Sequence, residues 1–407
     1  MYTARQPGQT RRWPYALGVI ILLAAYGGWT LGRALPAVQP VINQSALQAK
    51  ASAGSLQWPA QGQAAVGVAG SSILETHGQQ QPSPTASTAK LITALTVLAA
   101  KPLSTGQSGP SIALNSSDVA IYNNYVAEDG SLVRVQNGEQ ISEYQMLQAM
   151  LLPSANNMAD SLAIWAFGSL KDYHQAANQY LEDKGLVETH VGSDASGFNP
   201  STTSTARDLV RIGELVMQNP VLAQIVGQPS ASDIPVAGNI KNVNSLLGTD
   251  GIIGIKTGNT DQAGGVFVSA SRITVNNKPV IIVTALAGAP GLWQAMNSSL
   301  PLIKSAQANF KPVTAVKKGA GVAVYGVPWG KPVAATAAQN LSLDAWGGSK
   351  VSTQVHLQNI TTKNHAGQTI GSVTTPKSAS NNRLSIPIKL QTTLSKPSTW
   401  WRLTHPF

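Results

Sequence analysis

The feature that most constrains the fold is an uncharged, largely apolar run of twenty residues from Trp13 to Gly32. In hydrocarbon every backbone N–H and C=O must be paired within the segment, so a run of this length crosses a bilayer as a single α-helix. Three arginines precede the run and one follows it. This charge asymmetry predicts that residues 1–12 are cytoplasmic and that the chain beyond the run lies outside the cytoplasm.

A cleaved signal peptide is the competing interpretation of the same run. We favour a retained signal-anchor because the apolar run is long and no clean Ala-x-Ala cleavage site follows it closely. Residues 33–57 lack apolar periodicity and are rich in Gln, Ala, Ser and Pro, which is typical of a linker. The expected location is therefore the cell membrane, with a single pass.

The composition excludes several kinds of chemistry. The chain has no cysteine, so disulfides, thiolate metal sites and cysteine catalysis are absent. Its six histidines are scattered without a ligand-like spacing, and we expect neither a metal site nor a cofactor. With 407 residues, 37 of them Gly, and only 11% charged, the chain is expected to form two compact, sheet-containing domains.

The positive charge of the chain is concentrated towards its ends. Residues 310–407 hold eleven Lys or Arg and one acid, Asp344. Short β-type runs alternate there with Gly, Pro, Asn and Ser turns, which predicts a small all-β domain. Its charge has two interpretations, a solvated lysine-rich surface or a surface that binds anionic polymers of a cell wall or membrane. No nucleic-acid-binding motif accompanies the charge, so we expect no nucleic-acid partner.

A possible nucleophile lies where a loop becomes an apolar helix, in the stretch from Pro84 to Leu98. Ser87 and Lys90 are three residues apart and share one helical face, which allows a hydroxyl to pair with an amine. The positive N-terminal end of the helix favours an alkoxide on Ser87 and a neutral Lys90. The alternative interpretation is a capping serine beside a surface lysine.

Two further short motifs follow in the chain. Ser154-Ala155-Asn156 lies between two predicted helices, the first of which begins with a capping box at 142–145. Lys256-Thr257-Gly258 ends the first of three predicted strands, at 251–258, 265–273 and 279–287, with a turn at Asn276-Asn277 and a helix at about 293–306.

The order S-x-x-K, S-x-N and K-T-G resembles that of the penicillin-recognising serine enzymes. The flanking segments at 150–157, 196–208 and 254–264 are similar to those of the D-alanyl-D-alanine carboxypeptidases among the low-molecular-mass penicillin-binding proteins. A serine β-lactamase is the nearest alternative, but the chain lacks a Glu-x-x-Leu-Asn segment between the second and third motifs. The resemblance implies an α/β (α+β) fold for 58–309, an antiparallel sheet flanked by helices with an all-helical subdomain.

The resemblance also implies a mechanism. Peptidoglycan stem peptides would be the substrates and β-lactams the covalent inhibitors. Ser87 would attack the carbonyl between two terminal D-alanines, and Lys90 would accept its proton if burial and the nearby charge of Lys256 keep the amine neutral. The other implied roles are proton transfer to the leaving amine by Ser154, positioning by Asn156, and substrate binding by Lys256, Thr257, Gly258 and Asn259.

Two departures from the family pattern bear on specificity. Position 157 is Asn where the family commonly has Asp, a change that we expect to affect only helix capping. Residues 285–303 contain no arginine, although family carboxypeptidases resemble one another in an arginine that meets the terminal carboxylate. D,D-endopeptidase or transpeptidase action therefore stays open, as does a catalytically silent homologue that binds wall or penicillin.

Overall fold

The computed structural model describes residues 13–275, 277–375 and 383–405. The chain forms two units. The larger unit comprises Ser52–Lys311 and Trp346–Gly348, and the smaller unit comprises Met1–Ala51, Pro312–Ala345 and Ser349–Phe407. Each unit is described by itself. The predicted cytoplasmic segment 1–12 lies outside the described residues, and so does Asn276 of the predicted turn.

The larger unit is built on a five-stranded antiparallel sheet in the order β11-β12-β13-β3-β4. The strands are β11 (Ile252–Thr260), β12 (Gly264–Val275), β13 (Lys278–Ala289), β3 (Gln63–Val68) and β4 (Leu74–His77). The predicted strands of this sheet and the predicted helix that follows them are confirmed, with bounds shifted by one or two residues. This agreement arises because the long buried strands carry continuous apolar runs.

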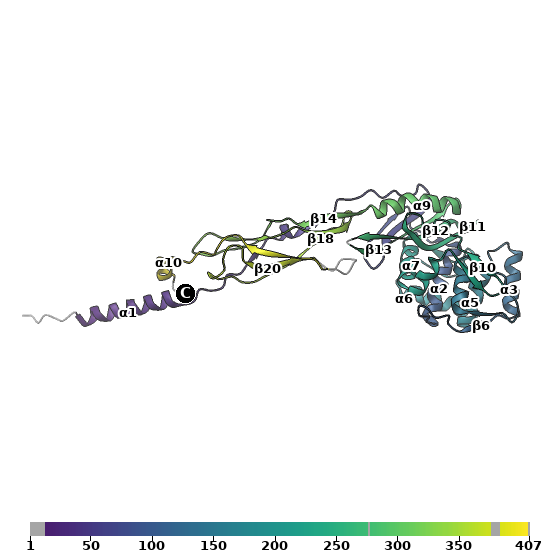
Figure 1. Ribbon diagram of the computed structural model, residues 1–407, viewed down its shortest axis with the longest axis horizontal. Helices are drawn as coiled ribbons and strands as arrows, with labels where there is room; N and C mark the ends of the chain where they lie inside the picture. Colours follow the sequence, from purple (N-terminus) through teal and green to yellow (C-terminus); the bar gives the residue numbers. More distant parts are fainter. Residues whose placement is uncertain (1–12, 276, 376–382, 406–407) are drawn as a thin grey trace, which may run out of the picture. The chain divides into compact units, whose positions relative to one another are not determined.

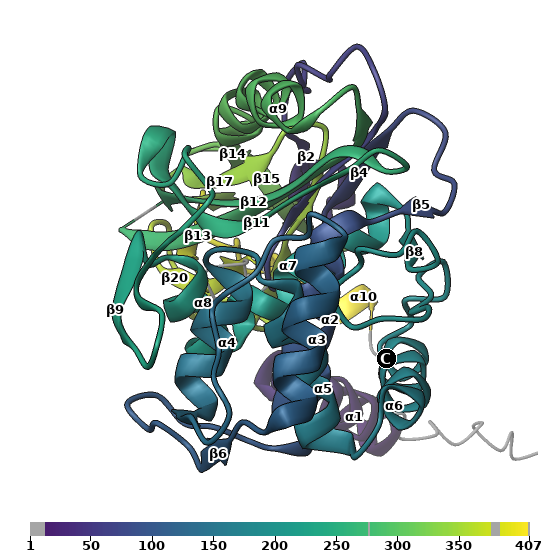
Figure 2. The ribbon, with the colours of Figure 1, turned by 90° about the vertical axis from the view of Figure 1, so that its right-hand side faces the viewer.

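Helices cover both faces of this sheet (Figure 2). Along β13, Ile282 and Leu286 pack in the cluster that holds α9 (Leu292–Gln307), whereas Val283 and Ala285 pack in the cluster that holds α7 (Ala206–Gln218). The alternation follows from the two-residue period of a strand, which sends successive side chains to opposite faces.

A helical layer lies on the α7 side of the sheet. Its helices are α2 (Ala89–Ala100), α3 (Ser116–Ala127), α4 (Glu143–Leu151), α5 (Asn156–Phe167), α6 (Leu170–Asp183) and α8 (Pro220–Val226). Residues 89–98 of α2 are all buried, so α2 is the central helix of this layer. The predicted capping box is confirmed at the start of α4, where Ser142 and Gln145 exchange hydrogen bonds. The predicted antiparallel sheet with flanking helices is therefore confirmed.

Short elements connect the helices. Three two-stranded pairs and two 3-10 turns complete the larger unit: β5 (Ser83–Pro84) with β8 (Thr203–Ser204), β6 (Ser111–Ala113) with β7 (Gln140–Ser142), β9 (Ser230–Ile234) with β10 (Gly238–Lys241), η2 (Ala86–Thr88) and η3 (Thr249–Gly251).

The smaller unit contains a β domain, as predicted. Its six-stranded antiparallel sheet has the order β1 (Val41–Ile42), β15 (Gly321–Tyr325), β16 (Val333–Ala337), β21 (Ser385–Leu390), β20 (Thr369–Thr374) and β19 (Gln354–Leu357). β2 (Gln48–Lys50) pairs with β18 (Lys350–Ser352), and β14 (Phe310–Val316) pairs with β17 (Leu341–Trp346). Its helical elements are η1 (Gln44–Leu47), α1 (Trp13–Gly32) and α10 (Thr399–Thr404).

The interpretation of 33–57 as a plain linker is wrong for residues 38–50. Val38 forms a bridge with Ile360, β1 pairs with β15, and β2 pairs with β18. Leu47, between these strands, is only 2% exposed and belongs to the core of the β domain. Strands of two or three residues are too short to show the alternation that would have revealed them.

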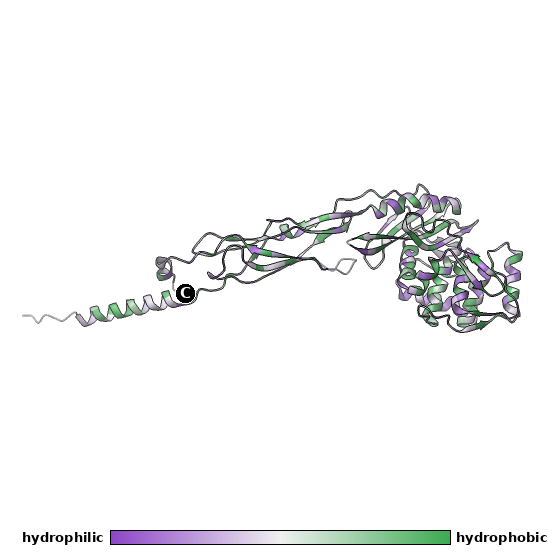
Figure 3. Cartoon of the chain, viewed as in Figure 1, coloured by the Kyte–Doolittle hydropathy of each residue, from purple (hydrophilic) through white to green (hydrophobic). Residues whose placement is uncertain are grey.

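The apolar run forms α1, a helix long and apolar enough to cross a bilayer, although a signal sequence near an N-terminus would pass the same test. Figure 3 shows apolar residues along most of its length. Thr30 is its one buried residue. The predicted helix over 13–32 is confirmed.

Candidate active site

Ser87 lies at the start of the central helix of the larger unit, in η2, which runs directly into α2. Lys90, one turn later, is fully buried, and its Nζ donates a hydrogen bond of 2.8 Å to Ser87 Oγ. Ala86 before the serine has a φ of +44°, in the left-handed region that side chains other than glycine rarely adopt. The predicted pairing of hydroxyl and amine is therefore present, on a backbone turn held under strain.

Three acceptors surround the Lys90 amine. Besides Ser87, Nζ donates to Asn156 Oδ1 at 2.7 Å and to the backbone oxygen of Ser196 at 2.9 Å. Burial lowers the pKa of Lys90 to about 7, although the carboxylates of Asp194 and Asp160 act in the opposite direction. An amine with this pKa is neutral in about half of the molecules at neutral pH, so it can accept a proton from a hydroxyl.

Ser154 and Lys256 form a second pair of hydroxyl and amine. Lys256 Nζ donates to Ser154 Oγ at 2.9 Å and to the backbone oxygen of Thr257 at 3.0 Å. Ser154 has a φ of +68° in the loop between α4 and α5, which again indicates a strained backbone at a polar side chain. Burial and the charge of Lys90 hold the pKa of Lys256 well below its usual range. The charge of Lys90 therefore lowers the tendency of Lys256 to carry a proton, whereas burial alone lowers the pKa of Lys90.

Asn156 connects the pair of Ser87 and Lys90 to the helical layer. It is the first residue of α5, is 2% exposed, and its backbone N–H donates to the Ser131 oxygen at 2.7 Å. Its side-chain oxygen accepts from Lys90, so the side-chain amide nitrogen stays oriented by that contact.

The third motif lies on β11, the first strand in the order of the large sheet. Thr257 is paired with Phe267 of β12 and is 3% exposed. A Cβ added to Gly258 would lie 3.1 Å from the backbone nitrogen of Ser87, so the glycine lets β11 approach the serine turn closely. We expected this glycine to make room for a substrate, and the structure adds a packing reason for it.

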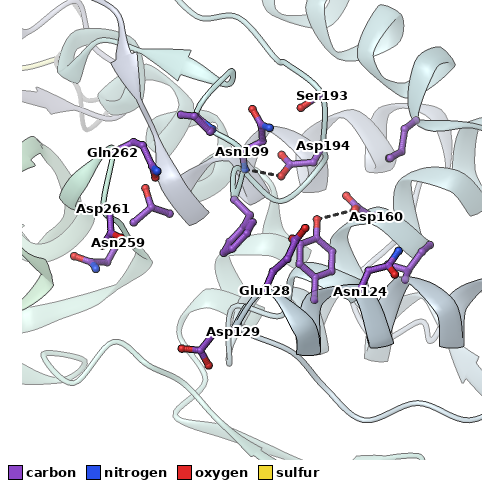
Figure 4. A pocket seen from close by; sticks show the side chains of 16 residues that line it. Asn124, Glu128, Asp129, Asp160, Ser193, Asp194, Asn199, Asn259, Asp261 and Gln262 are labelled. Carbon is purple, nitrogen blue, oxygen red and sulfur yellow. Dashed lines mark hydrogen bonds between the residues drawn. The ribbon is translucent and has the colours of Figure 1, made fainter.

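Asn259 is the next residue of β11 and is exposed. It lines a cavity of about 880 Å³ (Figure 4). Tyr125, Asp160 and Asp194 also line this cavity, whereas the residues of the three motifs do not. The structure thus brings Ser87, Lys90 and Asn156 into one hydrogen-bonded group and Ser154 and Lys256 into another, with Thr257, Gly258 and Asn259 on the adjoining strand.

The cavity is acidic. Its lining includes Glu128 and Asp129 from the end of α3, Asp261 after β11, and the more deeply buried Asp160 and Asp194, and no lining residue is Lys or Arg (Figure 4). Its potential therefore favours cationic groups over a carboxylate. Within the part of the chain that the structure describes, no group of three or more His, Asp or Glu is placed to hold a metal ion.

A loop at residues 193–199 supports Lys90, a role that was not predicted from the sequence. Asp194 accepts hydrogen bonds of 2.8 Å from the backbone N–H groups of Gly197 and Asn199. These bonds fold the loop tightly, so that it presents the Ser196 oxygen to Lys90. The loop was noticed in the sequence only for its similarity to the family, because no spacing rule connects it to residue 90.

Two buried side chains reinforce the same loop. Asp160 on α5 accepts from the Ala195 N–H and from the Tyr125 hydroxyl, both at 2.8 Å. Burial, assisted by the charge of Asp194, raises the pKa of Asp160 to about 6. Asp160 lies four residues after Asn156 on one helical face, a spacing that could have pointed to it, whereas no sequence signal distinguishes Tyr125.

Asn157 does more than cap a helix, which corrects the prediction made for it. Its side-chain oxygen accepts from the Val133 N–H at 3.0 Å, and its side-chain nitrogen donates to the Val133 oxygen at 2.9 Å. This two-way pairing requires an amide, because a carboxylate has no donor for the Val133 oxygen.

Amides also occupy the region after β13, where the sequence has no arginine. A Cβ added to Gly291 would lie 3.0 Å from Gln294 Oε1 and 3.9 Å from Asn259 Oδ1. Both side chains near Gly291 are therefore neutral amides.

Comparison with known proteins gives a consistent result. The sequence profile of the D-alanyl-D-alanine carboxypeptidase family matches residues 48–288. The chain is similar to D-alanyl-D-alanine carboxypeptidase DacB2 of Mycobacterium tuberculosis, with 33% identity over 54% of this chain and 74% of that protein. It is also similar to a D-alanyl-D-alanine endopeptidase of Pseudomonas aeruginosa, with 32% identity over 49% of this chain and 62% of that protein.

Solved structures share the fold. Penicillin binding protein 5 of Haemophilus influenzae matches with a TM-score of 0.57 and 20% identity, over 84% of this chain and 98% of that one. A peptidoglycan synthesis regulatory factor (PBP3) of Streptococcus pneumoniae matches with a TM-score of 0.58 and 20% identity, over 84% of this chain and 100% of that one.

Proposed function

Because the chain belongs to the D-alanyl-D-alanine carboxypeptidase family, we propose that it hydrolyses the bond between the two terminal D-alanines of peptidoglycan stem peptides through an acyl-enzyme on Ser87. The observation that carries this proposal is the 2.8 Å hydrogen bond between Ser87 Oγ and a buried Lys90 whose pKa is lowered to about 7. A neutral amine in contact with a hydroxyl is the pairing that activates a serine nucleophile.

In the acylation step, Lys90 Nζ takes the proton of Ser87 Oγ while Oγ bonds to the carbonyl carbon of the penultimate D-alanine. The oxyanion formed there receives hydrogen bonds from the backbone N–H groups of Ser87 and Asn259, each typically worth about 10²–10³ in rate. The carbon–nitrogen bond then breaks, and the departing amine of the last D-alanine takes the proton that Lys90 accepted from Ser87, relayed through the hydroxyl of Ser154, which Lys256 contacts. Lys90 is then neutral again.

In the deacylation step, a water replaces the departed amine. Lys90 takes a proton from that water, the hydroxyl adds to the ester carbon, and Ser87 Oγ leaves with the proton returned by Lys90. A β-lactam acylates Ser87 in the same way, but its opened ring stays attached and blocks the water. We therefore propose that β-lactams are covalent inhibitors.

The substrate backbone is proposed to lie along the outer edge of β11, as an added strand would. Thr257 and Lys256 offer hydrogen-bond donors, a hydroxyl and a buried amine, to the substrate carboxylate. Gly258 leaves the strand edge bare, and Asn156 holds the peptide amide. The burial of Thr257 and Lys256 in the strand that adjoins Ser87 supports this arrangement.

A D,D-endopeptidase acting on cross-links is the second candidate. It is favoured by the neutral amides of Gln294 and Asn259, which lie near Gly291 after β13, where family carboxypeptidases have an arginine. A cross-linked peptide would present an amide to these side chains instead of a free carboxylate. One relative, from Pseudomonas aeruginosa, is a D-alanyl-D-alanine endopeptidase. A catalytically silent homologue is less favoured, since each motif position holds a residue capable of the proposed chemistry.

We also propose that α1 anchors the chain in the cell membrane by a single pass, with the chain beyond α1 outside the cytoplasm. The length of α1 and the arginines before it support this orientation. We further propose 58–309 and 310–407 as the limits of the two domains.

Labelling with a fluorescent penicillin tests the proposed nucleophile. Ser87→Ala should abolish covalent labelling, because Lys90 contacts no other hydroxyl among the described residues. Ser83→Ala is the matched control, since Ser83 lies four residues upstream in β5 and contacts Gln63 instead. Full labelling of the Ser87→Ala protein would refute the assignment.

A further inference from the structure

The short helix α10 lies against the C-terminal end of α1, within the smaller unit (Figure 1). The Tyr26 hydroxyl donates to the Leu403 oxygen at 2.6 Å, and an Arg33 guanidinium nitrogen donates to the His405 oxygen at 3.0 Å. Tyr26, Thr30 and Arg33 follow each other at helical spacing, so one face of α1 makes these contacts. Thr30, in the middle of that face, is the buried residue of α1.

Arg402 of α10 caps the end of α1. Its guanidinium donates to the backbone oxygens of Leu31 and of Arg33, the latter at 2.9 Å. The last carbonyl groups of a helix have no partner within the helix, and the C-terminal end carries partial negative charge. A guanidinium supplies hydrogen-bond donors to these carbonyl groups and positive charge opposite the negative helix end. Its planar fork donates to two oxygens at once.

The β domain in turn holds α10. Leu394, just before the helix, is 1% exposed and belongs to the core of that domain. Trp329 donates through Nε1 to the Ser395 oxygen at 2.9 Å, and its ring meets the Trp401 ring edge-on at 5.1 Å. The Ser398 hydroxyl caps the start of α10 by accepting from the Trp401 N–H. The contacts therefore form a continuous path from the β core to α1.

The chain also joins α1 to the β domain directly and over a short distance. Residues 34–37 alone separate Arg33 from Val38, whose N–H and C=O both pair with Ile360. The end of α1 is thus held at two places, by the bridge at Val38 and by α10.

The exposed side chains around this junction fit the headgroup layer of a bilayer. Trp29 is 56% exposed and Trp400 is 74% exposed. Tryptophan is enriched where a membrane helix leaves the hydrocarbon, since its ring is apolar and its N–H polar. Arg33, over the Trp29 ring, and Arg402 add positive charge at the same level.

We infer that α10 is a clamp for the exit end of α1, and that the last two turns of α1 are a permanent part of the folded β domain. Signal cleavage anywhere from 33 to 37 would remove Tyr26, Leu31 and Arg33, the groups that α10 binds. The mature protein therefore keeps α1. This inference goes beyond the proposed function and does not depend on the activity at Ser87.

Cross-linking of the full chain in native membranes tests the clamp. Because the chain has no cysteine, an introduced pair provides the only thiols. Tyr26→Cys combined with Leu403→Cys should cross-link within one chain when a short bismaleimide is added. The matched control combines Gly28→Cys with Leu403→Cys, because residue 28 has a similar depth but points about 200° away around the helix.

Mass spectrometry of the peptide that joins the two positions gives the readout. Several-fold more cross-linked peptide with position 26 than with position 28 supports the clamp. Equal cross-linking of both pairs, cross-linking of neither, or a mature chain that lacks residues 13–33 would overturn it.

The role of Arg402 is tested in the Tyr26→Cys, Leu403→Cys background. Arg402→Ala should lower the cross-linking several-fold, and Arg402→Lys should lower it less, because a lysine keeps the charge but loses the fork. Unchanged cross-linking in Arg402→Ala would contradict a capping role. Penicillin labelling of each variant separates the two proposals. Normal labelling without the cross-link refutes the clamp alone. A normal cross-link without labelling counts against the proposed function alone.

Discussion

Two buried lysines, each in contact with a serine hydroxyl, give the larger unit its chemistry. Lys90 and Lys256 are among its most completely buried side chains, and neither contacts a carboxylate at hydrogen-bonding distance. Burying a lone ammonium is costly, so such groups shed their proton instead. The pKa of both lysines is lowered for this reason.

The pH dependence of acylation follows from the lowered pKa of Lys90. Only the neutral amine accepts a proton, and the neutral fraction grows as pH rises through about 7. The second-order rate constant for penicillin acylation should therefore rise from about pH 6 to about pH 8 and then level off. Stopped-flow measurement of that constant checks this, and a flat or falling profile over the same range would contradict it.

Asp160→Asn provides the internal check on this profile. The Asp160 carboxylate raises the pKa of Lys90, so its removal should move the midpoint of the profile to lower pH. Asp129→Asn is the control, because Asp129 lines the same cavity but is not among the groups that shift Lys90. A midpoint that does not move in Asp160→Asn would show that Asp160 acts only through the loop that it supports.

At the scale of elements, α5 carries much of the site. Its first two residues bind in different directions, Asn156 to Lys90 and Asn157 to the segment around Val133. One turn later, Asp160 reaches the loop that presents the Ser196 oxygen. The first two turns of α5 therefore hold Lys90, the segment around Val133 and the loop that carries Ser196 in fixed positions relative to one another.

Asn157→Asp should destabilise the larger unit. The carboxylate would lose the hydrogen bond to the Val133 oxygen and would face that oxygen with negative charge, a loss of about 1–3 kcal/mol for a buried group. Thermal unfolding at neutral pH measures it. Asn124→Asp on the exposed face of α3 is the control, and equal melting temperatures for the two variants would contradict this reading of Asn157.

Much of this architecture could be predicted from the sequence, for identifiable reasons. The strands from 252 to 289 are long and apolar, and the start of α4 carries a capping box, so local pattern was sufficient for both. The motif residues were recognised by resemblance. The support given by Asp160 and Tyr125 was not predicted, because it depends on contacts between residues 35 positions apart. The strands at 41–50 were missed because each is stabilised by partners more than 250 residues away.

At the scale of the whole molecule, the smaller unit carries the apolar helix α1 and much of the positive charge. Its described lysines at positions 317, 318, 331, 350, 363, 389 and 396 are all exposed. This surface supports binding to anionic wall polymers, while a spacer with a solvated surface remains the simpler alternative.

Binding of the detergent-solubilised full chain to purified cell walls distinguishes these two roles. If charge holds the protein there, binding should fall steeply between low and high salt, and Lys317→Glu with Lys318→Glu should weaken it at low salt. Lys278→Glu, a charge change in the larger unit, is the control. Binding that is indifferent to salt and to these substitutions would leave the spacer interpretation.

The central claim is that Ser87 removes a terminal D-alanine, and release of free D-alanine from a synthetic stem pentapeptide tests it most directly. The full chain in detergent should release D-alanine, and the Ser87→Ala protein should not. No release by an unaltered protein that penicillin still acylates at Ser87 would contradict carboxypeptidase action. That result would assign the site to cross-linked peptides, whose amide the neutral Gln294 and Asn259 would accept.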